Sequence, residues 1–591
     1  MKAILKLFSE HGTFIQPEAV TYISTREHPK EFASLLLENL KEYPLVLTLD
    51  QIKAIEQTSL VKNLPKLEEP TIKQQITEQL DLTKQDAILS EKPLETQIKT
   101  ELSPLDDKQK QKIILSKMYS TPPLRDENGE ETEEDYEDPD KDDQLAINGD
   151  EESEKPLIRP VELKKIKGWK PLAKEYSPEI KILKDVTGNS TCEGTTQDFA
   201  KLFKNRYTIL HKILQNQRRE LMNALPINRI KKSATNDVQL IGIVKNVRTT
   251  NNGHRLIEIE DETGEAPLIA LKTNPDILQI ANEVVLDEII GVNGKLSKNG
   301  DLIIIQNIVF PDISIQHNKQ KTEVPICAAF LSDIHMGSKM FLEEQWHAFL
   351  KWINGNLGNS RQKDVAGKVK YLVIPGDIVD GIGIYPNQEK ELSIKDIYRQ
   401  YEALASQMQL IPDHISIIIQ PGNHDAVRPA EPQPAFAKEI QDLFSGKEVH
   451  FVGNPCYFSL HSVEVLSYHG QSLLDYATNI QHLRYNEPIE IMKVMLKKRH
   501  LAPIYGGYTP LAPEHADFMI IDKVPDIFVT GHVHMAALDD YRGVTLINAS
   551  SWQAQTTYQK MLNFVPDSAK LPIVDLKTGS ATTMDFSQQI T

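Results

Sequence analysis

Short, continuous apolar runs alternate with amphipathic stretches in the C-terminal part of the chain, from about residue 324. Five of these runs end directly in a polar cluster: 326–331, 371–374, 415–419, 463–466 and 527–529. Continuous rather than alternating hydrophobicity is typical of strands that are buried on both faces of a sheet. The pattern predicts a layered α/β domain over 324–591, with polar side chains at the carboxyl ends of strands, where open α/β sheets bind ligands.

Further upstream, shorter apolar stretches predict five strands, at 238–244, 255–260, 266–271, 288–292 and 302–309. Turn signals at Asn251–Gly253 and Lys298–Gly300 separate them. Five short strands in about 80 residues predict a small β-barrel of the oligonucleotide-binding (OB) type over 236–315. Other small β-domains share this pattern, and such a barrel could also serve only as a contact between subunits.

The N-terminal part shows helical periodicity. Apolar stripes at 4–8 and 32–40 predict a small helical domain over 1–58. A helical or extended connector is predicted over 161–235, with an amphipathic helix at 198–214. Between them, residues 59–160 are rich in Lys, Glu, Gln and Pro, which predicts a flexible acidic linker.

Taken as a whole, the net charge of −17 argues against nucleic acid as a partner, because phosphates need cationic contacts. Most of this charge lies in one run, since residues 126–154 carry 16 acids and one lysine. The remaining chain is therefore close to neutral. A run of this kind is usually a solvated linker, with a docking tail or an electrostatic mimic as the alternative.

The remaining composition, with 40% hydrophobic and 25% charged residues, is typical of a globular protein. No stretch approaches the roughly 18 apolar residues of a membrane span, and the start lacks a secretory signal. Three distant cysteines indicate neither a disulfide framework nor a zinc site, and Cys327 is expected to be a buried thiol. We therefore expect a cytoplasmic protein without a membrane partner.

The five polar clusters combine carboxylate, imidazole and amide side chains, which are the ligands of Mn²⁺, Fe²⁺ or Zn²⁺ in mixed sites. Alternating spacing lets two side chains leave a strand end on the same side, and adjacent glycines permit tight turns. Any one cluster alone is more often a cap or a turn. Together, in this order, they predict a metal centre made by Asp333, His335, Asp377, Asn423, His469, His532 and His534.

The series D-x-H, G-D, G-N-H-D, H and G-H-x-H resembles the calcineurin-like metallophosphoesterases over about 324–555. The resemblance implies a four-layer α/β/β/α fold with two divalent ions that act on a phosphoester. We expect Mn²⁺, with Mg²⁺, Fe²⁺ or Zn²⁺ as alternatives. It further implies that one ion is held by Asp333, His335 and His534, the second by Asn423, His469 and His532, and that Asp377 bridges both.

A closer resemblance is carried by the runs 332–338, 421–429 and 530–534, and by the order of the predicted parts. These resemble the small subunits of archaeal family D DNA polymerases. The resemblance implies a proofreading 3′–5′ exonuclease that acts on single-stranded 3′ ends of DNA. It also implies a large catalytic subunit as partner, in a heterodimer or a larger assembly, and a nucleoid-associated location. A sliding clamp is a further candidate partner.

Three residues beside the ligands are candidates for catalysis. His424 is expected to be the general acid for the leaving 3′-oxygen, with Asp380 and Asp425 as orienting neighbours. The alternative for His424 is a hydrogen-bond donor that only supports a ligand.

Three further residues are candidates for DNA contacts. Arg428 could steer the DNA backbone or form a surface salt bridge. Tyr505 and Tyr508 could stack on an unpaired base or simply pack within their loop.

Two other functions remain open at this stage. The same metals would serve a phosphatase that acts on non-DNA phosphoesters, and the chain could be a catalytically minor scaffold. Because all seven candidate ligands are present, a catalytic role is expected. Polymerisation itself is expected to reside in the large subunit.

Overall fold

The computed structural model describes residues 158–588, except 165, 167, 233–235, 316, 386 and 562, together with a few positions between 14 and 52. Residues 1–149 and 150–591 form two separate compact units. In the first unit, β1 (Phe14–Ile15) pairs in parallel with β2 (Val46–Leu47), and Phe32 and Leu36 are buried. The apolar stripe at 4–8, the acidic run and the linker up to residue 157 lie outside the described residues.

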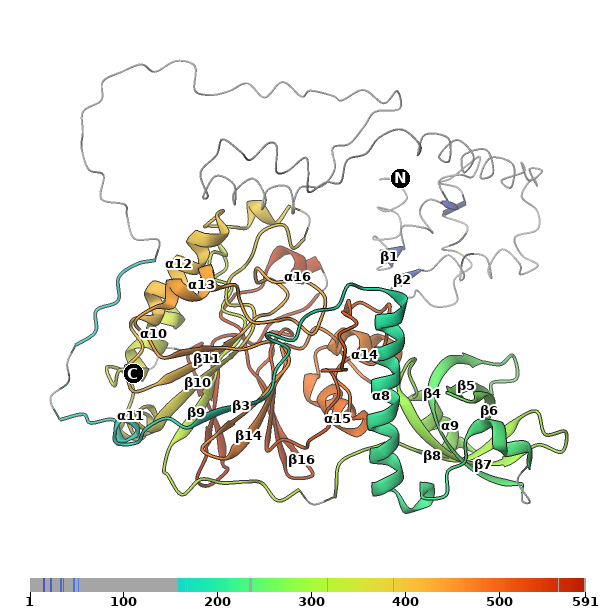
Figure 1. The fold of residues 1–591 in the computed structure, drawn as a ribbon. Helices are drawn as coiled ribbons and strands as arrows, with labels where there is room; N and C mark the ends of the chain where they lie inside the picture. Colours follow the sequence, from blue (N-terminus) through green and yellow to red (C-terminus); the bar gives the residue numbers. More distant parts are fainter. Residues whose placement is uncertain are drawn as a thin grey trace, which may run out of the picture. The chain divides into compact units, whose positions relative to one another are not determined.

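In the second unit, the connector contributes one strand and one long helix (Figure 1). Strand β3 (Ile180–Lys184) joins the edge of a sheet formed by later residues. Helix α8 (Thr196–Gln217) begins at a capping box, in which Thr195 Oγ1 accepts from the Asp198 amide and the Asp198 carboxylate accepts from the Thr195 amide. The helix predicted at 198–214 is confirmed, and it extends a few residues further at both ends.

Five strands form a closed barrel in the order β4-β5-β6-β8-β7, as predicted (Figure 1). Between β6 and β7, helix α9 (Pro275–Asn282) packs Ile277 and Ala281 against the core of the barrel. The barrel strands are β4 (Asp237–Thr249), β5 (Arg255–Asp261), β6 (Gly264–Ala270), β7 (Ile289–Leu296) and β8 (Ile303–Val309).

The C-terminal residues form most of two six-stranded sheets. The first has the order β12-β11-β10-β9-β18-β19, with β9 to β12 parallel. Its strands are β9 (Cys327–Phe330), β10 (Val369–Pro375), β11 (Ser416–Gln420), β12 (Val449–Phe451), β18 (Lys570–Asp575) and β19 (Ala581–Asp585).

The second sheet has the order β16-β17-β15-β14-β13-β3, with β14, β15 and β17 parallel. All five strands predicted from apolar runs are confirmed, but they are divided between the two sheets. Three runs became β9, β10 and β11, and the last two became β14 and β15. Besides β3, the strands of this second sheet are β13 (Cys456–Leu460), β14 (Val463–Ser467), β15 (Ile527–Thr530), β16 (Ala537–Tyr541) and β17 (Val544–Asn548).

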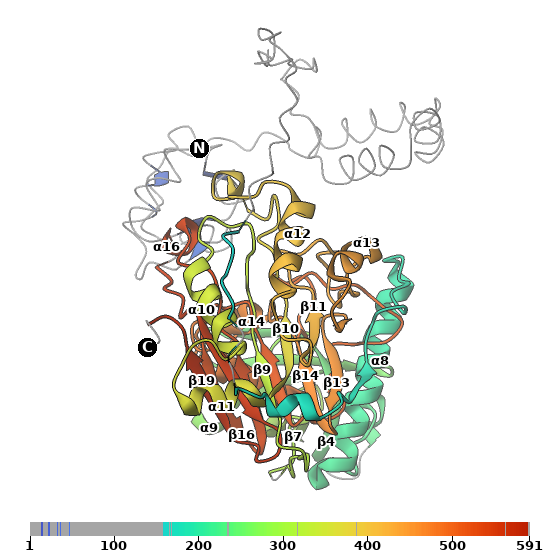
Figure 2. The same cartoon turned by 90° about the vertical axis from the view of Figure 1, so that its left-hand side faces the viewer.

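Apolar side chains from both sheets, among them Phe330, Tyr371 and Phe458, form a core between them. Helices α10 (Glu343–Ile353), α11 (Ser360–Lys368) and α12 (Ile397–Met408) cover the outer face of the first sheet (Figure 2). Helices α14 (Leu473–Asn479) and α15 (Pro488–Lys498) cover the second. The central strands are therefore buried on both faces, which explains their continuous hydrophobicity.

The packing tests one side-chain prediction. Cys327 is buried, as expected, and so is Cys456.

In the part of the chain that the structure describes, no helix is long and apolar enough to cross a membrane.

A buried ionic joint connects helix α8, the barrel and the loop after α15. Arg206 on α8 and Asp517 are both fully buried, with 2.7 Å between Nε and Oδ2. The guanidinium also donates to the carbonyl oxygens of Asp287 and Pro503, at 3.0 and 2.6 Å. His500 Nε2 lies 2.9 Å from the same Asp517 oxygen. Because every member has partners, the joint holds the three segments in one geometry.

We expect Arg206→Met to lower the free energy of unfolding by about 3–5 kcal/mol, because it leaves Asp517 buried without its cation. The double variant Arg206→Met/Asp517→Asn should lose less, since no buried charge remains. Lys204→Met is the control, because Lys204 lies on the same helix as Arg206 but forms only an exposed ion pair, with Glu262, and its loss should cost under about 1 kcal/mol. Denaturant titration measures all three, and equal losses for Arg206 and Lys204 would contradict the role of the joint.

The effect should depend on pH. Burial opposes ionisation of Asp517, but His500 and Arg206 outweigh it and hold the pKa of Asp517 below its usual value. A folded pKa below the unfolded value of about 3.9 means that this stabilisation is complete above that pH and is lost as the pH falls. The difference between wild type and Arg206→Met should therefore shrink in acid.

Candidate metal centre

The predicted ligands meet where strands of both sheets end. Asp333, Asp377 and Asn423 follow β9, β10 and β11, and the histidines 469, 532 and 534 follow β14 and β15. Backbone hydrogen bonds tie these turns together, since the Asp333 and His335 amides donate to the carbonyls of Gly376 and Asp377. The carboxyl ends of these strands, from both sheets, therefore lie together at one edge of the domain.

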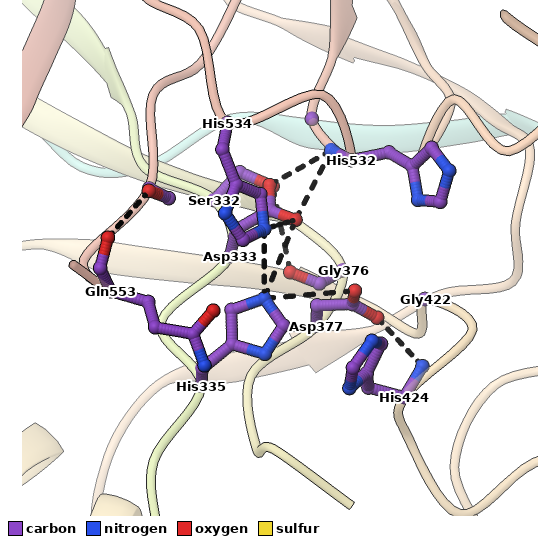
Figure 3. A network of polar contacts seen from close by, with 12 residues as sticks. Ser332, Asp333, His335, Gly376, Asp377, Gly422, His424, His532, His534 and Gln553 are labelled. Atoms are coloured by element: carbon purple, nitrogen blue, oxygen red, sulfur yellow. Dashed lines mark hydrogen bonds and ion pairs between the residues drawn. The ribbon is translucent and has the colours of Figure 1, made fainter. Parts of the chain in front are cut away.

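A first group consists of Asp333, His335 and His534, whose potential ligand atoms all lie within 4.8 Å of one another. His335 Nε2 and His534 Nε2 are 3.0 Å apart and face each other, and His534 Nε2 is 3.4 Å from Asp333 Oδ1. All three residues are buried. Figure 3 shows the two imidazoles converging on Asp333 from different loops.

A second group consists of Asp377, His469 and His532, again within 4.8 Å of one another. His469 Nε2 lies 3.3 Å from Asp377 Oδ2 and 3.0 Å from Asn423 Oδ1. Asp377 Oδ2 is also 3.9 Å from His335 Nε2 in the first group. One oxygen of Asp377 therefore faces both groups, and the structure brings all seven predicted ligands together.

The orientation of the histidines suits cation binding. His335 Nδ1 donates to Asp380 Oδ1 at 3.0 Å, and His469 Nδ1 donates to the Pro375 carbonyl at 2.9 Å. Each hydrogen bond places the proton on Nδ1, so that Nε2 directs a lone pair into the centre. Neutral nitrogens and carboxylates that converge in this way repel one another unless a cation lies among them. The donor set therefore fits one or two divalent ions.

The local field also favours positive charge. Burial acts against a charged imidazole, but Asp377 and Asp333 raise the pKa of His469 to about 10. Burial likewise opposes ionisation of Asp377, but His469 and His424 hold its pKa well below the usual value. Burial and His469 lower the pKa of His532 to about 3. The ionised carboxylates thus attract positive charge to the centre, which either a proton on His469 or a bound metal ion can supply.

The backbone at the centre adopts conformations that are rare for side chains other than glycine. Asp333, His335, Asp377, His532 and His534 have φ values of 52°, 50°, 50°, 67° and 58°. Asp and His tolerate this left-handed region better than most residues do, but at a cost. Strain of this kind is retained where the surrounding structure enforces it, most often at functional sites.

The glycines predicted beside the ligands are needed for close approach or for unusual φ. A Cβ at Gly422 would lie 2.2 Å from Asp377 Oδ1, and one at Gly531 would lie 2.5 Å from Asp333 Oδ2. Gly376 and Gly470 have φ of 97° and 116°. Larger residues at these positions would displace the carboxylates or the turns that carry them.

The three candidate catalytic residues lie next to the ligands. Asp380 accepts from His335, and its backbone carbonyl lies 2.7 Å from His424 Nδ1. The His424 amide donates to Asp377 Oδ1 at 2.8 Å. Burial and Asp377 raise the pKa of Asp425 to about 7, and its carboxyl group accepts from the Gly422 amide at 2.8 Å. Asp425 therefore supports the turn that carries Asn423 and His424.

The three candidate DNA contacts are placed differently. Arg428 Nη1 forms an ion pair with Glu514 at 2.7 Å; a salt bridge is the predicted alternative, but the Glu514 carboxylate is buried rather than on the surface. Tyr505 packs edge-on against Phe199 of α8, with ring centroids 4.7 Å apart. Tyr508 is 59% exposed. Arg428 and the Tyr505 ring are thus engaged within the protein.

Two residues at the centre were not found from the sequence. Gln553 Nε2 donates to Asp380 Oδ1 and to Ser338 Oγ, both at 2.9 Å. The side-chain nitrogen Nε2 of Gln559 lies 3.0 Å from His534 Nδ1. Neither glutamine follows a predicted strand or belongs to a motif, so no local pattern pointed to them.

Comparisons with known proteins assign the family. Residues 328–537 match the family model that describes the B subunits of DNA polymerases alpha and epsilon. The DNA polymerase II small subunit of Archaeoglobus fulgidus is 46% identical over 66% of this chain and 77% of its own length. That of Methanocaldococcus jannaschii is 42% identical over 68% of each chain. That of Methanothermobacter thermautotrophicus is 41% identical over 73% of this chain and 88% of its own. The chain belongs to the family of DNA polymerase II small subunits.

Proposed function

We propose that this chain is a metal-dependent 3′–5′ exonuclease that proofreads DNA for the polymerase of which it is a subunit. The observation that carries the proposal is Asp377 Oδ2, which faces two groups of converging ligands at once. A pair of divalent ions that share one carboxylate is the usual device for phosphodiester cleavage. A family of polymerase subunits makes DNA the natural substrate.

The wider architecture supports the same proposal. Helices on the outside of two facing sheets, with ligands at strand ends, agree with a calcineurin-like phosphoesterase fold. The closed barrel supplies a domain of the kind that binds single strands. The partner is a large subunit that carries the polymerising centre, because a small subunit is by its name one part of such an assembly.

The proposal gives each predicted ligand a role. Asp333, His335 and His534 would hold one cation, and Asn423, His469 and His532 the other, with Asp377 between them. When bound, Mn²⁺ or a similar ion would neutralise the phosphate and activate the attacking water. Asp380 fixes the tautomer of His335 from behind, and Gln553 in turn holds Asp380.

His424 is suited to protonate the leaving oxygen. Its Nδ1 is tied to the Asp380 carbonyl, so Nε2 is the nitrogen left to face substrate, and the side chain is 17% exposed. Burial would lower the pKa of His424, but the carboxylates of Asp377 and Asp380 outweigh burial and raise it. The carboxylates therefore favour the protonated imidazole, the form that can donate to the departing 3′-oxygen.

The full chain, co-purified with its large subunit, should remove 3′-mismatched nucleotides from a primer in the presence of Mn²⁺. Chelation should abolish the reaction. The chain without its partner should show no template-directed synthesis. A preparation that hydrolyses an aryl phosphate but leaves single-stranded and mismatched DNA intact would favour a phosphatase instead.

Asp377→Asn should lower the rate of DNA cleavage by at least about 10³-fold, because it removes the charge shared by both ligand groups. Calorimetric titration with Mn²⁺ should show weaker binding or none. Asp364→Asn, which changes an exposed carboxylate on α11, should behave as wild type. Unchanged Mn²⁺ binding in Asp377→Asn would refute the proposed bridging role.

His424→Ala should retain Mn²⁺ binding but lower kcat on DNA by about 10²–10⁴-fold. The loss should nearly disappear with the p-nitrophenyl ester of thymidine 5′-monophosphate, because nitrophenolate leaves without a proton. Equal losses on both substrates would mean that His424 positions its neighbours rather than acting as the acid.

A further inference from the structure

Two stacked tyrosines lie beside the candidate metal centre. Tyr385 and Tyr558 have ring centroids 5.9 Å apart and an interplanar angle of 22°. Tyr558 belongs to the short helix α16 (Thr557–Met561) and is 49% exposed. Tyr385 is partly buried, and its hydroxyl donates to Glu391 Oε2 at 3.2 Å, which anchors the ring. The pair is therefore anchored through Tyr385, while about half of the Tyr558 side chain is open to solvent.

Both tyrosines are connected to the centre through their neighbours. Gln559, next to Tyr558, contacts His534 Nδ1. On the other side, the Ile384 amide donates to Gln388 Oε1 at 2.9 Å, and Gln388 Nε2 donates to the Asp380 carbonyl at 2.8 Å. The same Asp380 carbonyl also lies 2.7 Å from His424 Nδ1. The pair thus stands on the rim of the centre, between segments that hold His534 and His424.

Exposed apolar side chains and two lysines lie near the pair, together with the Glu391 carboxylate that accepts from Tyr385. Ile382, Ile384 and Met561 are 43%, 37% and 67% exposed, which is unusual for three large apolar side chains on adjoining segments. Lys339 Nζ donates to the Lys390 carbonyl, which places its charge near the same loop, and Lys560 on α16 is exposed. Exposed rings among lysines suit a ligand that is both flat and polyanionic, namely single-stranded nucleic acid.

We propose that the Tyr385–Tyr558 pair is a stacking platform for the unpaired terminal base of a DNA strand whose phosphate enters the centre. The inference rests on the proposed exonuclease function and extends it to substrate selection. A base within a duplex is already stacked and paired, so it gains little from the platform. A mismatched or frayed 3′ end gains the full stacking contact, and the platform therefore favours the ends that proofreading must remove.

The test uses the full chain with its large subunit and oligonucleotides that end in either a normal or an abasic 3′ nucleotide. Wild type should cleave the base-bearing end with the higher kcat/KM. Tyr558→Ala should reduce this preference by about 5- to 150-fold, the range that stacking of one base supplies. Tyr558→Phe should keep the preference. Tyr558→Leu should lose it while retaining apolar bulk, which separates stacking from packing of α16.

Tyr398→Ala is the matched control, because Tyr398 is 41% exposed but lies on α12 rather than in the pair. It should keep the wild-type preference, and melting temperatures of all variants check that they fold. A second readout needs no cleavage. A 3′-terminal 2-aminopurine should lose fluorescence when wild type binds it without metal, and Tyr558→Ala should not cause this loss.

The two readouts separate the proposals. An absence of fluorescence change in wild type, or a Tyr558→Ala variant that keeps both the change and the base preference, would overturn the platform. Neither result touches the exonuclease assignment if mismatched ends are still cleaved. Conversely, quenching that depends on Tyr558 in a preparation without nuclease activity would retain the platform and remove the proposed function.

Discussion

Repulsion and attraction around one buried carboxylate organise the C-terminal half of this protein. Asp377 is ionised, fully enclosed and faced by imidazoles from two different sheets. Such a charge is stable only where other groups balance it. The His424 amide donates to Asp377 Oδ1. The lack of a side chain at Gly422 lets the backbone come close to the same oxygen. The charges around Asp377 therefore favour a cation, and the buried Asp and His clusters beside it have the donor atoms that could hold one.

The layered fold makes this arrangement possible. Parallel strands with helices on one side and a second sheet on the other end at a common edge, and each turn there carries polar side chains. Five of the predicted ligands have a left-handed backbone, which is unfavourable for residues other than glycine. The tertiary structure therefore holds these residues in strained conformations at the point where their side chains converge. Well-packed cores on both faces of each sheet supply the stability that tolerates this strain.

The segment after β17 has a larger part in the site than its sequence suggests. It returns across the edge of the sheets, where Gln553 holds Asp380 and Gln559 contacts His534. Tyr558, from the same segment, stands at the rim. One stretch of chain would thereby support the ligands and also select the DNA end. Asp380 likewise has two contacts at the centre: its side chain orients His335, and its backbone carbonyl orients His424.

The sequence by itself determined the strands, the barrel and the seven converging side chains, because burial on both faces and the chemistry of metal ligands both leave local patterns. The roles assigned to those side chains remain predictions. Only the tertiary structure decided how the five apolar runs divide between two sheets, since hydrophobicity does not specify a neighbour. It alone joined Arg206 to Asp517 and Arg428 to Glu514. Contacts between residues far apart in the chain arise from packing, and the sequence around one partner contains no pattern that identifies the other.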